Sequence, residues 1–204
     1  VPMPKYNEIK LSLNVWPRVG TLIKKAKADI VHIATEGPIG IFAKRYCVKN
    51  NIKFTTSYHT QFDKYLKLYY PYLPIKLAQK FLKNFHEKAE KILVTTQSMK
   101  EELEEIGFNK DQMVVWTRGA NHGSFNKPKK INLEYKRPIY LYVGRVSIEK
   151  NIRAFLDLDL EGTKLIVGKG PDLKKLKKEY LDAIFKGERT NGELASYFAS
   201  SDVF

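Results

Sequence analysis

The amino-acid sequence predicts an α/β protein with two doubly wound parallel sheets, and three observations support this fold class. First, short β-branched apolar runs alternate with amphipathic helical patterns through most of the 204 residues, which is typical of βαβ units. Second, this alternation lapses between residues 119 and 136, where Asn, Gly, Pro and Lys crowd together as in an interdomain linker, and then restarts. Third, apolar residues make up 43% of the chain, which is too many for a disordered segment.

The first domain, expected over residues 1–120, alternates four strands with three helices. The expected strands are 30–34, 54–58, 92–95 and 113–116, and the expected helices are 38–50, 74–90 and 98–106. Pro38 stands in the first turn of its helix, where a missing N–H breaks no hydrogen bond. Gly107 ends the third helix. The second helix is predicted by apolar residues at intervals of three and four, namely Ala78, Phe81, Leu82, Phe85 and Ala89.

A linker is expected at 121–136, and 137–204 is expected to be the first part of a second domain. Its strands are predicted at 139–143, 164–167 and 183–185, and its helices at 149–156, 171–179 and 192–200. Segment 201–204 follows an amphipathic helix and ends in apolar residues, which predicts the first residues of another buried strand. A strand that stops so early cannot cover the apolar face of the preceding helix. We therefore expect the second domain to be truncated and the chain to be a fragment of a longer protein.

Composition excludes several kinds of protein. Cys47 is the single cysteine, which excludes a disulfide framework and a multi-cysteine zinc site and fits a reducing compartment, most simply the cytoplasm. No apolar run reaches about 18 residues, so no membrane-spanning segment is predicted. The formal net charge of +14 predicts attraction to polyanions.

Candidate ligand-binding residues follow the predicted strands, because ligands of doubly wound sheets gather at the carboxyl ends of the strands. In chain order these residues are Glu36, Gly37, His59, Thr60, Gly144, Arg145, Lys150, Gly168, Gly170 and Pro171. Two cations beside a glycine-rich turn that opens a helix are suited to bind a diphosphate. The alternatives are an ordinary strand-to-helix turn with solvated charges, a structural His59, and a Glu36 that only complements the dipole of the following helix.

Other chemistry-bearing residues are assigned structural roles. His32 lies within a predicted strand and is expected to pack, and Cys47 is expected in the core because no general base is paired with it. His86 falls on the polar shoulder of a lysine-rich helix and is expected at the surface. Asp157 and Asp159 follow a helix, so no Asp-x-Asp motif stands at a strand end and no metal site is predicted.

Several ordered motifs resemble the GT-B glycosyltransferases of family 4. They lie at 29–40, 55–62, 115–119, 143–151, 167–171 and 192–204. The branch that looks most similar holds the lipid mannosyl-, glucosyl- and sulfoquinovosyl-transferases of bacteria and plastids. The resemblance covers nearly the whole chain, and several motifs in one order are more specific than any one of them.

The resemblance implies a role for each candidate residue. On the donor side it implies that Arg145 and Lys150 bind the diphosphate, with further donor contacts from Gly144, Gly168, Gly170, Pro171, Glu188 and Arg189. On the acceptor side it implies Glu36, Gly37, His59 and Thr60. His59, Arg145 and Lys150 are the implied catalytic residues, with no metal and no cofactor, because the substrate is itself a UDP- or GDP-linked sugar.

Two departures from the family pattern stand out. Lys169 replaces the acid of the usual Gly-Asp-Gly-Pro turn, and Ala120-Asn121 replaces the usual Val-Asp of the linker. The glycine-rich N-terminal loop and the Glu-x7-Glu donor motif of the family are absent. The chain is therefore expected to be inactive by itself.

The resemblance implies a retaining hexosyltransferase that uses a membrane glycerolipid or phospholipid as acceptor. We expect it in the cytoplasm, peripheral on the inner face of the membrane. Seven lysines between residues 64 and 91 interleave with tyrosine and phenylalanine. Such a stretch suits an anionic bilayer surface, and the alternative is an ordinary helix with a solvated face.

Two further alternatives for the function are a basic nucleic-acid-binding protein and a catalytically inactive relative that binds nucleotide sugars. A dinucleotide-dependent oxidoreductase is disfavoured because no strand is followed by Gly-x-Gly-x-x-Gly. The oligomeric state is not predicted.

Overall fold

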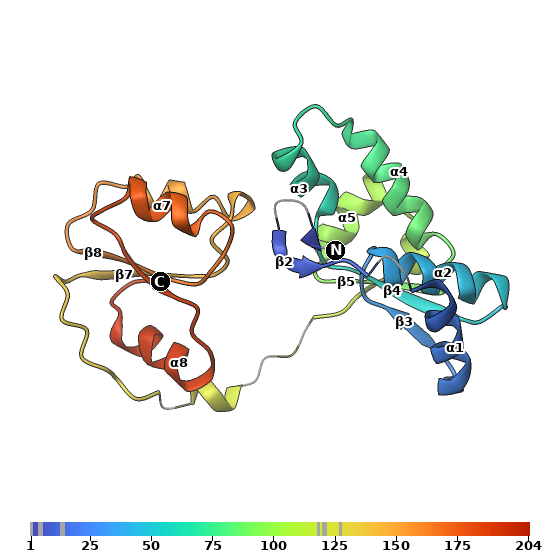
Figure 1. The fold of residues 1–204 in the computed structure, drawn as a ribbon, viewed down its shortest axis with the longest axis horizontal. Helices are drawn as coiled ribbons and strands as arrows, with labels where there is room; N and C mark the ends of the chain where they lie inside the picture. The colour runs from blue at the N-terminus through green and yellow to red at the C-terminus, as the bar shows by residue number, and fades with distance from the viewer. Residues whose placement is uncertain (1, 4–5, 13–14, 118, 120–121, 127) are drawn as a thin grey trace. The chain divides into compact units, whose positions relative to one another are not determined.

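The chain forms two compact units, Val1–Arg118 and Gly119–Phe204 (Figure 1). The computed structural model describes residues 2–3, 6–12, 15–117, 119, 122–126 and 128–204. The expected boundary at residues 120 and 121, and with it the Ala120-Asn121 departure, lies outside these residues. The assignment of the units to an acceptor side, a linker and a donor side stays a prediction.

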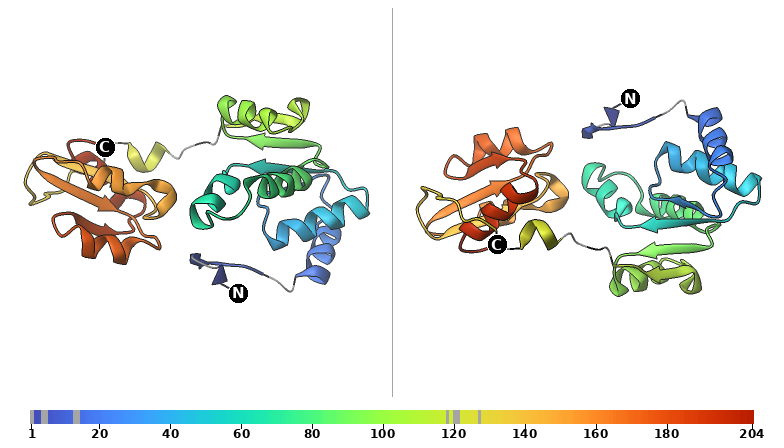
Figure 2. Two further views of the ribbon diagram at one scale, coloured as in Figure 1. Left: turned by 90° about the horizontal axis from the view of Figure 1, so that it is seen from above. Right: turned by 90° about the horizontal axis from the view of Figure 1, so that it is seen from below.

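The first unit is built on a parallel sheet in the order β3-β4-β5-β6. Its strands are β3 (Val31–Ile33), β4 (Phe54–Tyr58), β5 (Lys91–Val94) and β6 (Met113–Val115). Its helices are α1 (Trp16–Ala26), α2 (Pro38–Lys49), α3 (Phe62–Tyr69), α4 (Ile75–His86), α5 (Gln97–Glu105) and the short η1 (Lys110–Gln112). Helices α1 and α2 lie side by side (Figure 2). An antiparallel pair, β1 (Pro2–Met3) and β2 (Tyr6–Lys10), precedes α1.

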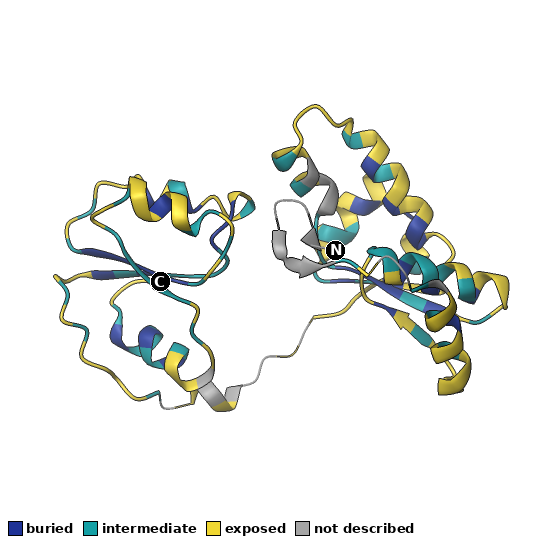
Figure 3. Ribbon diagram, viewed as in Figure 1, coloured by how far each residue is buried: buried dark blue, intermediate teal, exposed yellow. Residues whose placement is uncertain are grey.

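The core of this unit gathers apolar side chains from the strands and from the inner faces of the helices. Figure 3 marks the buried residues of the ribbon in dark blue. Cys47 is fully buried in it, and burial raises the pKa of its thiol. Its placement in the core is confirmed. Helix α4 ends four residues before the expected end, because Ala89 donates back to the His86 carbonyl at 2.9 Å and Glu90 donates to Phe54 in β4 at 2.8 Å.

The second unit has a parallel sheet in the order β7-β8-β9. Its strands are β7 (Ile139–Val143), β8 (Thr163–Val167) and β9 (Ile184–Gly187), and its helices are α6 (Ile152–Leu156), α7 (Leu173–Glu179) and α8 (Asn191–Ser200), with short turns η2 (His122–Phe125) and η3 (Ile148–Lys150). Helices α7 and α8 cover opposite faces of the sheet (Figure 1), so this unit has two apolar clusters, one on each face.

The end of the chain pairs with the sheet as expected, but it is not buried. Val203 forms a parallel bridge with Tyr140 of β7, on the edge of β7 away from β8. Val203 is 50% exposed and Phe204 is 77% exposed, so the expected burial is wrong for these residues.

Two predicted helices of this unit differ from the structure. The helix expected at 149–156 is split into η3 and α6, because Asn151 between them adopts a positive φ of 44°. The helix expected at 171–179 begins at Leu173. Its expected first turn is instead bound to the loop after β7, where Asp172 donates its backbone N–H to the Val146 carbonyl at 3.1 Å. Among the described residues, no helix is both long and apolar enough to cross a bilayer.

Candidate active site

The loops after the three strands of the second unit are joined to one another through their backbones. Val146 donates to the Lys169 carbonyl at 2.9 Å, which ties the loop after β7 to the loop after β8. Gly168 donates to the Gly187 carbonyl at 2.8 Å, which ties the loop after β8 to the end of β9. Since these loops carry Gly144, Arg145 and 168–171, the structure brings the predicted donor segments together at one edge of the sheet.

The glycines of the β8 loop are required by this backbone packing. A Cβ atom at Gly168 would lie 1.8 Å from the Gly144 carbonyl oxygen, and one at Gly170 would lie 2.2 Å from the Val146 carbonyl oxygen. Sequence reasoning assigned these glycines to close approach of a ligand. The structure gives them a second reason, the approach of the chain to itself, and their contact with a donor stays a prediction.

The cationic segment after β7 is positioned by a tyrosine. The Tyr142 hydroxyl donates to the Arg145 carbonyl at 2.9 Å, and its pKa is raised by burial and then by the charge of Glu149. A Cβ at Gly144 would lie 2.9 Å from that hydroxyl oxygen, so a glycine there makes room for the contact. Arg145 is half-buried, and Lys150 is exposed at the end of η3.

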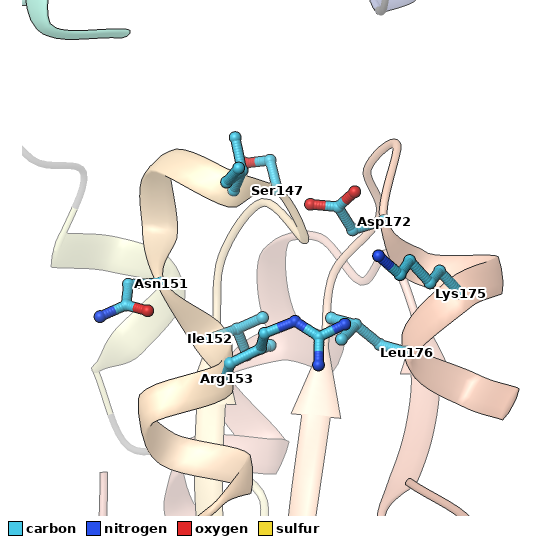
Figure 4. Close-up of a pocket in the computed structure, with 8 residues that line it drawn as sticks. Ser147, Asn151, Ile152, Arg153, Asp172, Lys175 and Leu176 are labelled. Atoms are coloured by element: carbon cyan, nitrogen blue, oxygen red, sulfur yellow. The ribbon is translucent and has the colours of Figure 1, made fainter. Parts of the chain in front are cut away.

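A cavity of about 120 Å³ lies between η3, α6 and α7 (Figure 4). Ser147, Asp172 and Lys175 are among its polar lining residues. Ser147 is fully buried, and its Oγ atom has no hydrogen-bond partner among the described residues. Arg145 and Lys150 are not among the described residues that line this cavity, so it is next to the predicted donor segment in sequence without containing the predicted cations.

The predicted nucleobase-side residues are engaged with their own chain. Lys169 Nζ lies 2.5 Å from Glu188 Oε2, in a pair whose side chains are both more than half exposed. Arg189 Nε lies 2.7 Å from Glu193 Oε1 in α8, and a hydrogen bond with Tyr197 raises the pKa of this arginine. Lys169, the departure from the family turn, therefore links the β8 loop to the β9 loop.

In the first unit, the predicted acceptor-side residues follow the neighbouring strands β3 and β4. Glu36 and Gly37 follow β3, and Gly37 is the N-cap of α2. His59 and Thr60 follow β4, and both are half-buried. Because β3 and β4 are parallel neighbours, their carboxyl ends place these two pairs at the same edge of the sheet.

A buried histidine contacts Glu36, which corrects the expected surface position of His86. The His86 side chain is 0% exposed, and its Nε2 lies 3.2 Å from Glu36 Oε1. Its Nδ1 lies 2.8 Å from Thr56 Oγ1 in β4. The prediction was wrong because helix α4 ends at His86 and lays this last residue over the sheet, among Tyr58, Phe85 and Phe108.

His32 is also placed differently from its expected packing role. It is exposed, and its two ring nitrogens lie 2.8 Å from Thr55 Oγ1 and 2.9 Å from Ser57 Oγ on the neighbouring strand. Asp157 follows α6 as expected and accepts a hydrogen bond from the Tyr180 hydroxyl. Within the described part of the chain, no three His, Cys, Asp or Glu side chains are grouped so that they could hold a metal ion.

Comparison with known proteins identifies the family. The family model described as Glycosyltransferase Family 4 matches residues 1–123, more than half of the chain. The chain belongs to glycosyltransferase family 4. The resemblance found in the sequence motifs is thereby confirmed.

Two curated relatives match the chain over its whole length. It is 27% identical over 217 aligned residues to the sulfoquinovosyl transferase SQD2 of Arabidopsis thaliana, covering 100% of this chain and 42% of the relative. It is 22% identical to an alpha-monoglucosyldiacylglycerol synthase of Streptococcus pneumoniae, covering 100% of this chain and 52% of the relative. The chain thus spans about half the length of these curated relatives.

A solved structure shares the fold. The chain aligns with Anabaena HepE, solved in complex with UDP and glucose, with a TM-score of 0.67 and 13% identity, over 91% of this chain and 55% of HepE. At this identity the likeness establishes the fold alone. It confirms the predicted GT-B fold class with its parallel sheets.

Sequence reasoning missed residues that lie beside the candidate site and pack against its loops. Tyr142 and Ser147 lie inside the motif at 143–151 or beside it, yet their contacts depend on tertiary packing. His86 and Thr56 are 30 positions apart, and no spacing rule connects them. The available signal was the polar Thr56 within a predicted strand, since a hydroxyl that the sheet buries requires a partner.

Proposed function

We propose that this family 4 chain is part of a retaining glycosyltransferase that moves a hexose from a nucleoside-diphosphate sugar to a membrane lipid. The observation that carries the proposal is family membership combined with the joined strand-end loops of the second unit, which hold Arg145 beside the glycine turn. The names of two relatives, a sulfoquinovosyl transferase and a monoglucosyldiacylglycerol synthase, support sugar transfer and a lipid acceptor. HepE, which binds UDP and glucose, supports a nucleotide donor.

On the donor side, the second unit supplies positive charge where negative charge develops. Breaking the anomeric C–O bond leaves negative charge on the departing diphosphate, and fixed cations stabilise that charge more strongly in the transition state than in the ground state. Arg145 is held through its backbone by Tyr142, and Lys150 stands exposed five residues later. We assign the diphosphate to this pair, with Gly144, Gly168, Gly170 and Pro171 beside it, Glu188 and Arg189 on the nucleobase side, and without a metal or further cofactor.

On the acceptor side, the first unit supplies groups that bind hydroxyls. The Glu36 carboxylate, the Gly37 backbone, the His59 imidazole and the Thr60 hydroxyl share one edge of the sheet. A carboxylate accepts hydrogen bonds from sugar or glycerol hydroxyls, and an imidazole can either donate or accept. His59 is assigned to the transferred sugar, and Glu36 to the acceptor.

Helices α3 and α4 and the turn between them form a docking patch for the membrane that holds the acceptor. Their exposed apolar residues are Leu68, Tyr70, Tyr72, Leu73, Leu77 and Phe81, and their exposed lysines are Lys64, Lys67, Lys76, Lys80 and Lys83. Apolar and aromatic side chains can enter the headgroup region while lysines attract anionic lipids. The occupant we assign is an anionic bilayer, at the inner face of the membrane.

Lys150→Ala tests the donor assignment in the full-length enzyme, because the chain itself spans only about half of its relatives. We expect turnover at saturating donor to fall by roughly 10²–10³-fold, as for loss of one preorganised charge contact. Lys177→Ala, at an exposed position on α7, is the matched control and should leave turnover unchanged. Equal turnover in both variants would remove Lys150 from the mechanism.

A further inference from the structure

We propose that His86 is a positioning residue that fixes the Glu36 carboxylate for binding of the acceptor, with Thr56 setting the state of its ring. This inference rests on the proposed acceptor role of Glu36. The three residues come from three elements: Thr56 from the centre of β4, His86 from the last position of α4, and Glu36 from the loop between β3 and α2.

For a neutral imidazole, the hydrogen-bonding chemistry of the three groups selects one tautomer. An ionised carboxylate only accepts hydrogen bonds, so the 3.2 Å contact requires that His86 Nε2 carries a proton and donates it to Glu36 Oε1. In the neutral ring Nδ1 is then an acceptor, and the Thr56 hydroxyl, 2.8 Å away, donates to it. Every polar atom of the imidazole is satisfied in this way, as a side chain with 0% exposure requires.

The surroundings of His86 prevent the ring from choosing another orientation. The Tyr58 and Phe85 rings pack edge-to-face against it, with centroid distances of 5.7 and 5.0 Å, and the Phe108 ring lies at 5.9 Å. A donor held by three aromatic rings has little rotational freedom to lose when it binds a carboxylate. The direction of the Nε2–H bond is therefore fixed by the core of the first unit.

Glu36 is partly accessible, unlike the histidine that holds it. Its side chain keeps an exposed fraction of 15%, so a ligand in solution can reach the carboxyl group while Oε1 is engaged by the imidazole. The next residue, Gly37, is the N-cap of the 12-residue helix α2, whose dipole also favours a negative charge at this end. Glu36 is thus oriented before an acceptor arrives, and preorganisation of this kind lowers the ordering cost of binding.

The tautomer of His86 is the first test, and it requires no variant of the histidine. In nitrogen-15 spectra of the 204-residue chain, we expect His86 as the Nε2–H form, with a slowly exchanging Nε2 proton. Glu36→Gln should move that proton resonance upfield, because a neutral amide is a weaker acceptor than a carboxylate. The matched control is His32→Gln, since His32 also contacts two hydroxyls but no carboxylate, and it should leave the His86 resonance in place. An Nδ1–H form of His86, or an Nε2 proton resonance that does not shift in Glu36→Gln, would overturn the proposal.

Kinetics of the full-length enzyme are the second test. His86→Phe keeps an aromatic ring but removes the donor, and we expect it to raise the acceptor KM about tenfold, the effect of losing one charge-assisted hydrogen bond, while the donor KM stays within about twofold. His86→Gln places an amide donor near the Nε2 position and should recover most of the loss. The double variant Glu36→Gln/His86→Phe should be no worse than Glu36→Gln alone, because the two residues act as one unit.

The outcomes separate this inference from the proposed function. If Glu36→Gln leaves the acceptor KM unchanged, the acceptor role of Glu36 is wrong, and the positioning role falls with it. If Glu36→Gln raises the acceptor KM but folded His86→Phe and His86→Gln both leave it unchanged, only the positioning role is wrong. Should His86→Phe fail to fold, the tautomer measurement and His86→Gln still decide the question.

Discussion

Asp202 binds the start of β7 through both carboxylate oxygens. Oδ2 accepts the Ile139 backbone N–H at 2.6 Å, and Oδ1 accepts from Arg137 at 2.8 Å. The backbone hydrogen bond, and then the arginine, hold the pKa of Asp202 below its ordinary value. A carboxyl group whose pKa is lowered by folding stabilises the folded state only while it is ionised.

The acid dependence of stability follows from this lowered pKa. The contribution of Asp202 is fully present above the pKa of the unfolded state, near 3.8, and is lost as pH falls through the lower folded-state value. We expect Asp202→Asn to lower the thermal midpoint of the second unit at pH 7 and to flatten its loss of stability on acidification below pH 4. Thermal unfolding followed by circular dichroism from pH 7 to pH 2 measures both. Identical pH profiles for the two proteins would contradict the role of this carboxylate.

At the scale of elements, the strands were predicted more closely than the helices. Strands β4 and β7 have the predicted bounds 54–58 and 139–143, because dense β-branched and aromatic runs between turn residues leave few alternatives. Helices α1 and α3 were not predicted. Helical periodicity predicted α4 but not the burial of His86. A pattern within one helix does not identify the strand against which the helix packs.

The candidate site residues were predictable only as far as the positions of the strands were. Residues after β3, β4, β7 and β8 could be selected because carboxyl ends of parallel strands share an edge. The contacts that hold them, such as the Tyr142 hydroxyl on the Arg145 carbonyl, join positions through space. The break at Asn151 was also outside sequence reasoning, because a positive φ at asparagine is permitted but not required.

The close packing of the loops after β7 and β8 predicts that alanine substitution affects stability very differently at two glycines. Gly168→Ala drives a Cβ into the Gly144 carbonyl, and we expect it to destabilise the second unit by about 1–3 kcal/mol, as overpacking does, and to weaken donor binding. Gly192→Ala in α8 is the control, since its Cβ would meet nothing within 4 Å, and alanine favours a helix. Urea unfolding of both variants measures the difference. Equal stability of the two variants would show that the loops have room to part.

At the scale of the whole molecule, a net charge of +14 makes general attraction to anions a competing explanation for any membrane binding. The docking patch on α3 and α4 would bind a membrane more specifically than net charge does, because it combines lysines with exposed apolar side chains. Family membership favours the transferase interpretation over the nucleic-acid-binding alternative, which a basic composition alone would also fit.

Two matched charge variants distinguish membrane binding through the docking patch from general electrostatic attraction. Lys76→Gln/Lys80→Gln removes two charges from α4, and Lys174→Gln/Lys177→Gln removes two exposed charges from α7. We expect the first variant to bind anionic vesicles roughly 30-fold more weakly, at about 1 kcal/mol per lysine, and the second to bind like the wild type. Vesicle sedimentation at fixed salt measures both. Equal loss in the two variants, or equal wild-type binding to neutral vesicles, would leave the patch without its proposed role.

The contact between Asp202 and Ile139 also bears on biosynthesis. These residues are 63 positions apart, so a nascent chain has already extruded the first strand of the second unit long before the carboxylate that binds its leading amide is synthesised. Until then, the Ile139 amide can hydrogen-bond only to water or to other residues. The second unit can therefore complete its fold only after residue 202 has been synthesised.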